Sequence, residues 1–140
     1  NKNKNYYFYK KKNNYGANYF IKKKKQKKNN LIKKISLDKF EKKISNSKTL
    51  IWVDTQGLEP DVLNGAKKLI NRNIPFVIEF TPQFFYKSNN KEKIFKTLNL
   101  FNYYYDLYSS AKKTKINNHN IDNLFKIYKK SNTELLLTNF

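Results

Sequence analysis

The clearest pattern of apolar and polar positions lies in the middle third of the chain. Leu50–Val53 is a continuous apolar run, which is typical of a strand buried on both faces in a parallel sheet. After Pro60, helical spacing predicts one amphipathic helix whose inward face carries Val62, Leu63, Ala66, Leu69 and Ile70. Ile74–Ile78 begins a second buried strand, which closes with Glu79. Two buried strands joined by such a helix predict a right-handed βαβ unit.

Residues 1–30 alternate Lys/Asn tracts with aromatic clusters. Tyr6–Tyr9 and Tyr19–Ile21 predict two β-strands, and Asn13–Gly16 has the composition of a turn between them. We interpret residues 22–30 as a solvated loop and residues 31–35 as another short strand. Ser36 is then a candidate N-cap for a helix that places three apolar residues on one face: Leu37, Phe40 and Ile44.

The C-terminal part predicts further helices and strands in alternation. A loop leads to a helix over Lys91–Phe101, with Ile94, Phe95, Leu98 and Phe101 facing inward. Tyr103–Tyr108 predicts a strand, and residues 109–120 are polar and loop-like. A short amphipathic segment over Ile121–Tyr128 precedes a final strand at Glu134–Leu137.

Length and composition exclude several classes of protein. A chain of 140 residues predicts a single domain with a modest core. No apolar run reaches the roughly 18 residues that a membrane-spanning helix needs. With no Cys there is neither a disulfide framework nor a cysteine nucleophile, and with His119 as the single histidine we expect no metal site. The chain begins at Asn1 and contains no Met, which we interpret as the sign of a fragment.

The net charge of +20 permits a second reading of the chain, as a basic module that binds nucleic acid through Lys tracts and exposed aromatic residues. However, Arg72 is the single arginine among 30 cations, and arginine is the residue that forks onto phosphate and guanine. Lys, Asn, Ile, Tyr and Phe are all encoded by AT-rich codons, so genome composition explains the charge better than selection for a polyanion partner. We therefore expect no specific nucleic-acid partner and no membrane span, and we expect a cytoplasmic protein.

Carboxylates follow both predicted strands of the βαβ unit. Asp54 and Glu79 come at the carboxyl ends of apolar runs, where open α/β sheets bind their ligands. If the two strands are neighbours, the two carboxylates line one rim, where they can bind an ammonium or hydroxyl group or act as a base. The alternative is structural: Asp54 closes a turn or caps a helix, and Glu79 pairs with a nearby Lys.

The order of several short motifs resembles the C-terminal half of FkbM-type methyltransferases. That family shows a "(T/S)LD" element, then a strand ending in "D-(V/T)-(E/Q)-G-x-E", then "VL-x-GA", then a strand ending in "P-x-x-x-x-E". This chain matches with Ser36–Asp38, Asp54–Glu59, Val62–Ala66 and Pro75–Glu79. Leu135–Asn139 also resembles the usual last strand of the family, so the resemblance covers residues 31–140.

The resemblance implies an α/β fold, the Rossmann-like sheet of class I methyltransferases, and S-adenosyl-L-methionine as the methyl donor. It implies that Asp54 and Glu59 are catalytic residues, that Asp54, Gln56 and Gly57 contact the donor or shape its loop, and that Glu79 binds the acceptor. The implied reaction is O-methylation of a hydroxyl on a sugar or another small metabolite. The implied acceptor is therefore a small molecule or a glycan.

Family members hold the donor with a glycine-rich loop after the first strand of the sheet. Gly16–Asn18 echoes part of that loop, but no apolar strand or acidic residue precedes it, so we assign Gly16 to a hairpin turn instead. We expect the donor-binding strands to be missing and this piece alone to be inactive. The predicted organisation is a Lys/Asn-rich β-hairpin and loop over residues 1–30, inserted in the domain, followed by the C-terminal half of a methyltransferase domain over residues 31–140.

Overall fold

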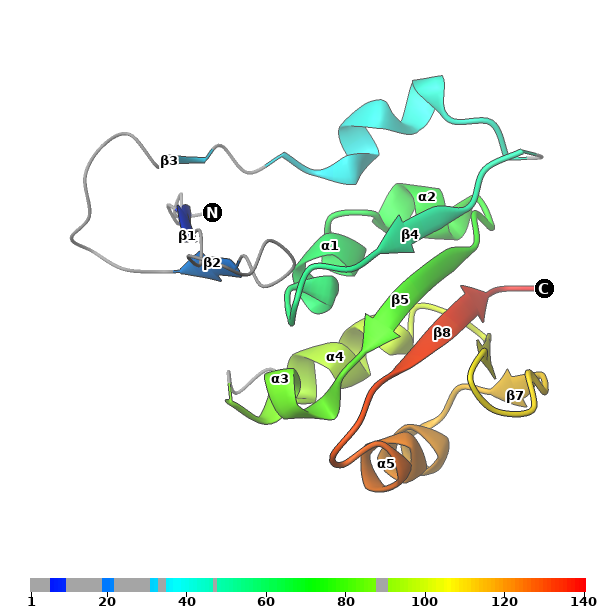
Figure 1. Cartoon of the computed structure of the whole chain (residues 1–140). Coiled ribbons are helices and arrows are strands. Elements are labelled where there is room, and N and C mark those ends of the chain that lie inside the picture. The colour runs from blue at the N-terminus through cyan, green and yellow to red at the C-terminus, as the bar shows by residue number, and fades with distance from the viewer. Residues whose placement is uncertain (1–5, 10–18, 22–30, 33–34, 47, 88–90) are drawn as a thin grey trace. The chain divides into compact units, whose positions relative to one another are not determined.

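The computed structural model describes the chain except for residues 1–5, 10–18, 22–30, 33–34, 47 and 88–90 (Figure 1). The chain divides into two compact units, residues 1–35 and residues 36–140. The sequence had placed a boundary between residues 30 and 31. Whether the first unit is an insertion in a larger domain stays a prediction.

The first unit contains a small antiparallel sheet. Its strands are β1 (Tyr6–Tyr9), β2 (Tyr19–Ile21) and β3 (Leu31–Ile32), in the order β2-β1-β3. The two aromatic strands are confirmed, and they pair antiparallel with Phe8 opposite Phe20. The predicted hairpin gains β3 as a third strand, on the other side of β1. The predicted turn at Asn13–Gly16 and the predicted loop over residues 22–30 lie outside the described residues.

The second unit is built on a five-stranded sheet in the order β4-β5-β8-β6-β7. The strands are β4 (Ile51–Val53), β5 (Phe76–Phe80), β6 (Tyr103–Asp106), β7 (Thr114–Lys115) and β8 (Thr133–Thr138). The parallel pairing of β4 with β5 confirms the predicted β-α-β connection. The last strand, β8, lies between β5 and β6 and runs antiparallel to both. The structure is therefore a mixed α/β fold, as predicted.

Helical segments connect these strands and lie mainly along one face of the sheet (Figure 1). They are the 3₁₀ helix η2 (Leu37–Lys43) and the α-helices α1 (Glu59–Asn64), α2 (Lys67–Asn71), α3 (Pro82–Lys87), α4 (Lys91–Leu98) and α5 (Asn118–Ile127). The sequence missed α3, β7 and the first turn of α5, which it had read as loops. No helix among the described residues is both long enough and apolar enough to cross a membrane.

The prediction of a single helix between β4 and β5 is wrong, because the structure has two short helices there, α1 and α2. The backbone carbonyl of Gly65, at the break, accepts hydrogen bonds from Ser36 Oγ and from the backbone N–H of Asp38. Asp38 Oδ1 in turn accepts from the backbone N–H groups of Lys68 and Leu69 at the start of α2. Polar groups of η2 therefore satisfy backbone groups that a continuous helix would have paired internally.

The prediction that β4 is buried on both faces is also wrong. Trp52 is 58% exposed and Leu50 is 53% exposed, whereas Val53 is buried. Among the described residues β4 pairs only with β5, so it forms an edge of the sheet, and the face that carries Trp52 has no helix over it. Phe40, expected on the inner face of its helix, is 43% exposed, while its predicted companions Leu37 and Ile44 do pack against the core.

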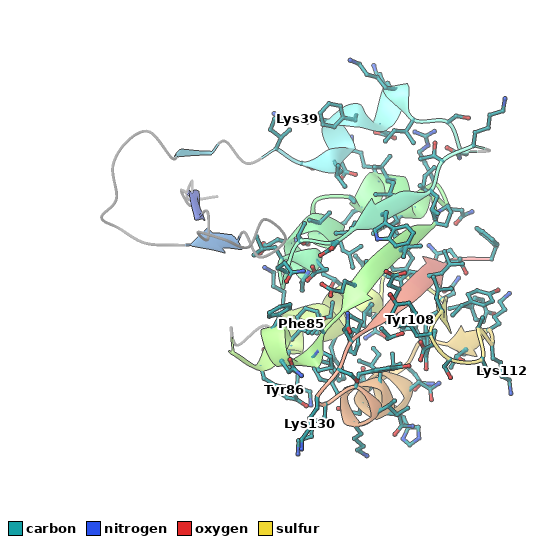
Figure 2. The ribbon with its side chains drawn as sticks, in the orientation of Figure 1. Lys39, Phe85, Tyr86, Tyr108, Lys112 and Lys130 are labelled. Atoms are coloured by element: carbon teal, nitrogen blue, oxygen red, sulfur yellow. The ribbon has the colours of Figure 1, made fainter. Side chains whose placement is uncertain are left out.

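The core lies between the other face of the sheet and the helices. Phe76, Ile78 and Phe80 alternate along β5 and are fully buried, as the strand period of two requires. The ring of Phe80 packs against Phe85 from α3 and Phe125 from α5, with centroid separations of 5.5 Å and 5.1 Å. Figure 2 labels Phe85 on the sheet side of α3, next to the exposed Tyr86. This packing holds β5 against the helices, and it thereby positions the carboxyl ends of β4 and β5.

Candidate functional site

The carboxyl ends of β4 and β5 bring Asp54 and Glu79 together. Val53 is the partner of Ile78 in the parallel ladder, so the next residues along the two strands emerge at the same end of the sheet. One side-chain amide joins them: Gln56 Nε2 donates to Asp54 Oδ1 at 2.9 Å and to Glu79 Oε2 at 3.0 Å. The predicted neighbourhood of the two carboxylates is confirmed, although Glu79 lies within β5 and not after its end.

A strained turn aims the Gln56 amide at these two carboxylates. Gln56 has φ 52° and Gly57 has φ 95°, so two successive residues adopt the left-handed region. Glycine is required at the second position for a further reason. A Cβ on Gly57 would lie 2.9 Å from the Cβ of Phe84, closer than real Cβ contacts allow. Both residues therefore have a conformational role in the loop after β4, in agreement with the loop-shaping role that the resemblance implied.

Glu59, the first residue of α1, is 1% exposed. Its Oε1 accepts from the backbone N–H of Thr55 at 2.8 Å and from Thr55 Oγ1 at 3.0 Å. Its Oε2 is buried and has no hydrogen-bond partner. Burial raises the pKa of Glu59 above its ordinary value of 4.5, and interactions with the backbone N–H groups of Glu59 itself, Thr55 and Gly57 and with the Thr55 hydroxyl only partly oppose that rise. The sequence marked Glu59 as a site residue, but not its burial.

Glu79 is half-buried and accepts hydrogen bonds from residues in two other parts of the chain. Besides Gln56, Asn132 Nδ2 donates to Glu79 Oε1 at 3.0 Å. Burial raises the pKa of Glu79 and the negative charge of Asp54 adds to the rise, while the hydrogen bond from Asn132 opposes it. The sequence could not have indicated Asn132, because it lies 53 positions away and no local pattern links the two.

We call Asp54, Glu59 and Glu79 the carboxylate cluster. One carboxylate oxygen from each of the three residues lies within 4.8 Å of the others. The ion pairs between described residues all lie elsewhere: Lys68–Glu41, Lys91–Asp122, Lys93–Asp61 and Lys96–Glu92. The sequence also allowed an alternative in which Glu79 pairs with a nearby Lys. No such ion pair is present among the described residues. The partners that the structure does show for the cluster are neutral amide and hydroxyl donors.

Two further acidic residues extend this rim across the sheet. Glu134 on β8 is the ladder partner of Glu79, and like charges directly opposite each other are unfavourable. The hydroxyl of Tyr108, labelled in Figure 2, donates to Glu134 Oε1 at 3.2 Å. Asp106, at the end of β6, accepts hydrogen bonds from the hydroxyls of Tyr128 and Thr133. The sequence had singled out neither Glu134 nor Asp106.

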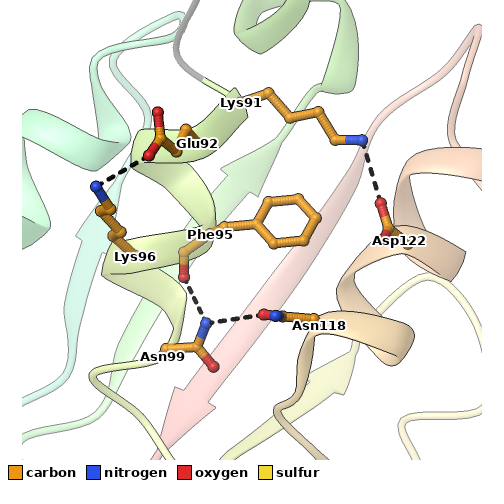
Figure 3. Close-up of a pocket in the computed structure, with 7 residues that line it drawn as sticks. All are labelled: Lys91, Glu92, Phe95, Lys96, Asn99, Asn118 and Asp122. Carbon is orange, nitrogen blue, oxygen red and sulfur yellow. Dashed lines mark hydrogen bonds and ion pairs between the residues drawn. The ribbon is translucent and has the colours of Figure 1, made fainter.

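A shallow groove of about 460 Å³ lies apart from these residues, between α4 and α5 (Figure 3). In the close-up, Lys91 Nζ reaches across to Asp122 Oδ1 at 3.1 Å, and Asn99 connects the carbonyl of Phe95 with Asn118. None of the predicted site residues lines this groove. Its four charged residues already form two ion pairs with one another, Lys91–Asp122 and Lys96–Glu92.

His119 and the Lys tract at residues 22–28 complete the list of sequence candidates. His119 is exposed, as expected, but it lies on α5 and not in a loop, and its Nε2 is 3.2 Å from Asn123 Nδ2. The Lys tract lies outside the described residues. Among the described lysines, Lys39, Lys112 and Lys130 are exposed and come from separate segments of the second unit (Figure 2).

Comparison with known protein families identifies the class to which this chain belongs. The model of the Methyltransferase FkbM domain family matches residues 1–107. The chain therefore belongs to the FkbM methyltransferase family, as the motifs predicted. The matched range includes all five predicted site residues: Asp54, Gln56, Gly57, Glu59 and Glu79.

The match differs in extent from the predicted resemblance. It begins at residue 1 and ends before β7, so the resemblance of Leu135–Asn139 to a family strand stays a prediction. Searches of curated proteins and of solved structures find no match to the chain. The comparisons support a methyltransferase and give no support to the nucleic-acid-binding alternative.

Proposed function

We propose that this protein takes part in S-adenosylmethionine-dependent methyl transfer to a hydroxyl oxygen of a sugar or another small metabolite. The observation that carries the proposal is the coincidence of the family match with the carboxylate cluster at the ends of two parallel strands. Ligands of open α/β sheets bind at such ends. The proposed fold is accordingly the Rossmann-like sheet of class I methyltransferases, and the parallel β4–β5 pair is consistent with it.

The chemistry of the cluster fits this donor. S-adenosylmethionine supplies an activated methyl group on a positively charged sulfur, and it also carries a protonated amino group. The carboxylates of Asp54 and Glu79 are negative groups at the rim, and an opposite charge nearby favours the binding of a cation. In this proposal Asp54 contacts the donor or orders the acceptor, and the strained Gln56–Gly57 turn shapes the loop backbone against the donor.

Methyl transfer to oxygen also requires that a proton leave the acceptor. The acceptor oxygen forms a bond to the methyl carbon as the carbon–sulfur bond breaks, and the hydroxyl proton passes to a base. Glu79 suits this role because burial and the charge of Asp54 raise its pKa, which makes the carboxylate a better proton acceptor. Glu59 orients the acceptor through the loop, since its Oε1 holds Thr55 by two hydrogen bonds.

The direct test is methyl transfer by the protein expressed from its complete natural reading frame. Binding of S-adenosylmethionine is measured by calorimetry, and transfer of isotopically labelled methyl groups is followed into a panel of sugars and small alcohols. We expect Asp54→Asn and Glu79→Gln to lower the turnover rate by at least about 100-fold, the usual contribution of a general base or a positioned charge.

The matched control is Asp122→Asn. It removes the same charge from the α4–α5 groove, and we expect it to leave turnover unchanged. Failure of the wild-type protein to bind the donor would contradict the proposed function. Transfer to nitrogen instead of oxygen, or equal activity of the Asp54 and Asp122 variants, would contradict the proposed reaction or the proposed site.

A further inference from the structure

We propose that Asp54, Glu59 and Glu79 form a binding site for one divalent cation that prefers oxygen ligands, such as Mg²⁺, Mn²⁺ or Ca²⁺. The inference goes beyond the proposed function, because cation binding requires neither the methyl donor nor an acceptor. The site shares residues with the proposed methyl-transfer site, so the experiments below separate the two proposals.

The spacing of the oxygen atoms fits one ion. Metal–oxygen distances for these cations are about 2.0 to 2.6 Å, so two ligands on opposite sides of an ion lie about 4 to 5 Å apart. One carboxylate oxygen from each residue of the cluster lies within 4.8 Å of the others. The separation of the three oxygen atoms therefore fits contact with a single ion.

The carboxylate of Glu59 is an independent sign of a missing partner. The residue is 1% exposed, and Thr55 occupies only Oε1. Oε2 is buried without a hydrogen bond, although buried polar atoms in folded proteins are nearly always paired. A bare cation coordinated by the cluster would supply that partner. An organic ammonium group is a poorer partner for this one oxygen of Glu59, because its carbon chain needs room beside a residue that is already enclosed.

The Gln56 amide occupies the position between Asp54 and Glu79 that a cation would take. Its Nε2 donates to both carboxylates, so one neutral donor stands between two negative groups. An amide carries an acceptor oxygen opposite its nitrogen, and rotation about the terminal bond exchanges the two. When an ion enters, the same side chain can present Oε1 as a further ligand, and the left-handed turn keeps it in place.

The distribution of lysine supports a cation that comes from outside the chain. The chain has 30 Lys and Arg residues, yet residues 49–66 and residues 73–86, which contain the whole cluster, include none. No described Lys or Arg is paired with the cluster, whereas Asp61 and Asp122, on helices, each pair with a lysine. Three acidic side chains gathered without an internal counter-charge favour a bound counter-ion.

The test is a calorimetric titration of the protein, expressed from its complete natural reading frame, with Mn²⁺ in the absence of any methyl donor. We expect saturable binding of one ion with a dissociation constant of about 1 mM or tighter, the range of oxygen-only protein sites. Mg²⁺ and Ca²⁺ are expected to compete with Mn²⁺ for the site.

Variants decide whether the bound ion occupies the cluster. Glu59→Gln keeps the side-chain shape and is expected to fold, and we expect it to weaken Mn²⁺ binding by at least tenfold. We expect Asp54→Asn to do the same, while Asp122→Asn, which removes an equal charge elsewhere, leaves binding unchanged. Thermal unfolding gives a second readout: Mn²⁺ is expected to raise the melting temperature of the wild type but not that of Glu59→Gln.

Absence of saturable Mn²⁺ binding to the folded wild type would overturn the proposal. So would a Glu59→Gln variant that binds as tightly as the wild type, or a control variant that loses binding equally. Cation binding by a protein that does not methylate would leave this inference standing and defeat the proposed function. Methyl transfer that is insensitive to the cation, by a protein that binds none, would do the reverse.

Discussion

Acidic residues in this protein occupy two contrasting environments. On the helices, Asp61 Oδ1 lies 2.7 Å from Lys93 Nζ, and Asp122 Oδ1 lies 3.1 Å from Lys91 Nζ. At the ends of β4 and β5, Glu59 is buried, Glu79 is half-buried and Asp54 is exposed, yet the described partners of all three are neutral. With 30 cations in the chain, lysine is not scarce. Position in the fold, and not composition, therefore decides which acidic residues are neutralised internally.

The helix carboxylates and the carboxylate cluster differ because they stand on different parts of the fold. Lys91 and Lys93 lie on α4, and their long side chains reach Asp122 on α5 and Asp61 on α1, where the charged groups keep some access to water. The cluster stands on a strand end, a tight turn and the first residue of a helix. Burying a charge there without a partner is unfavourable. Such an arrangement persists where function requires it, and the following predictions test that view.

The largest effect is expected for Gly57→Ala, which should lower the free energy of unfolding by about 1 to 3 kcal/mol. The new Cβ would be placed at φ 95° and 2.9 Å from the Cβ of Phe84. Gly65→Ala is the matched control, because Gly65 has φ −89° and its added Cβ would meet only ordinary contacts, the nearest at 3.4 Å. Urea denaturation measures both. If both variants lost the same free energy of unfolding, the turn at Gly57 would not require glycine more than position 65 does.

Glu59→Gln is expected to raise the stability of the cation-free protein by about 1 kcal/mol, a typical gain when a functionally constrained residue is relaxed. The pKa of Glu59 is raised, so the folded protein holds the proton more tightly than the unfolded chain does. The contribution of Glu59 to stability is therefore full below its ordinary pKa of 4.5 and is lost as the pH rises through its folded-state value.

The advantage of Glu59→Gln over the wild type should therefore be small at acidic pH and should grow toward neutral pH. Urea denaturation at a series of pH values, in buffer treated with a chelator, measures that difference. A variant less stable than the wild type at neutral pH would show that the charged form of Glu59 stabilises the fold, which is contrary to our interpretation.

The smallest effect is expected for the ion pair between Asp61 and Lys93. Breaking it should lower the stability of the protein, whereas Glu59→Gln should raise it. Asp61→Asn removes the partner of Lys93 and should lower the free energy of unfolding by less than about 1 kcal/mol, since these side chains remain partly accessible to water. Lys91→Gln, which breaks the more exposed pair with Asp122, should have a still smaller effect. Denaturation at low and high salt measures both. If Asp61→Asn stabilised the protein, the acidic residues on the helices would no longer differ from the carboxylate cluster in their effect on stability.

Much of the fold follows from local patterns in the sequence. Apolar runs predicted β4 and β5, and the alternation of Phe76, Ile78 and Phe80 with other residues gives a buried strand face. The motif Asp54–Glu59 predicted the family. These features depend on residues close together in the chain. The parallel pairing of the two strands also followed, because a short amphipathic connection leaves few other arrangements.

Other features depended on contacts between distant segments. Gly65 caps the C-terminus of α1, and at this break its carbonyl accepts hydrogen bonds from Ser36 and Asp38, which lie far away in the sequence. Trp52 has the composition of a core residue and is exposed because β4 is an edge. The sequence also predicted no metal site. That expectation weighed nitrogen and sulfur ligands and did not foresee three carboxylates meeting within 4.8 Å.

The sequence by itself determined which residues can carry charge, form strands and permit a left-handed turn. Only the tertiary structure decided that Glu59 is enclosed with an unpaired oxygen and that Asn132 holds Glu79. The reason is physical. The conformational preferences of a residue act over a few neighbours, whereas its burial and the charges around it are set by chain segments that meet only when the sheet assembles.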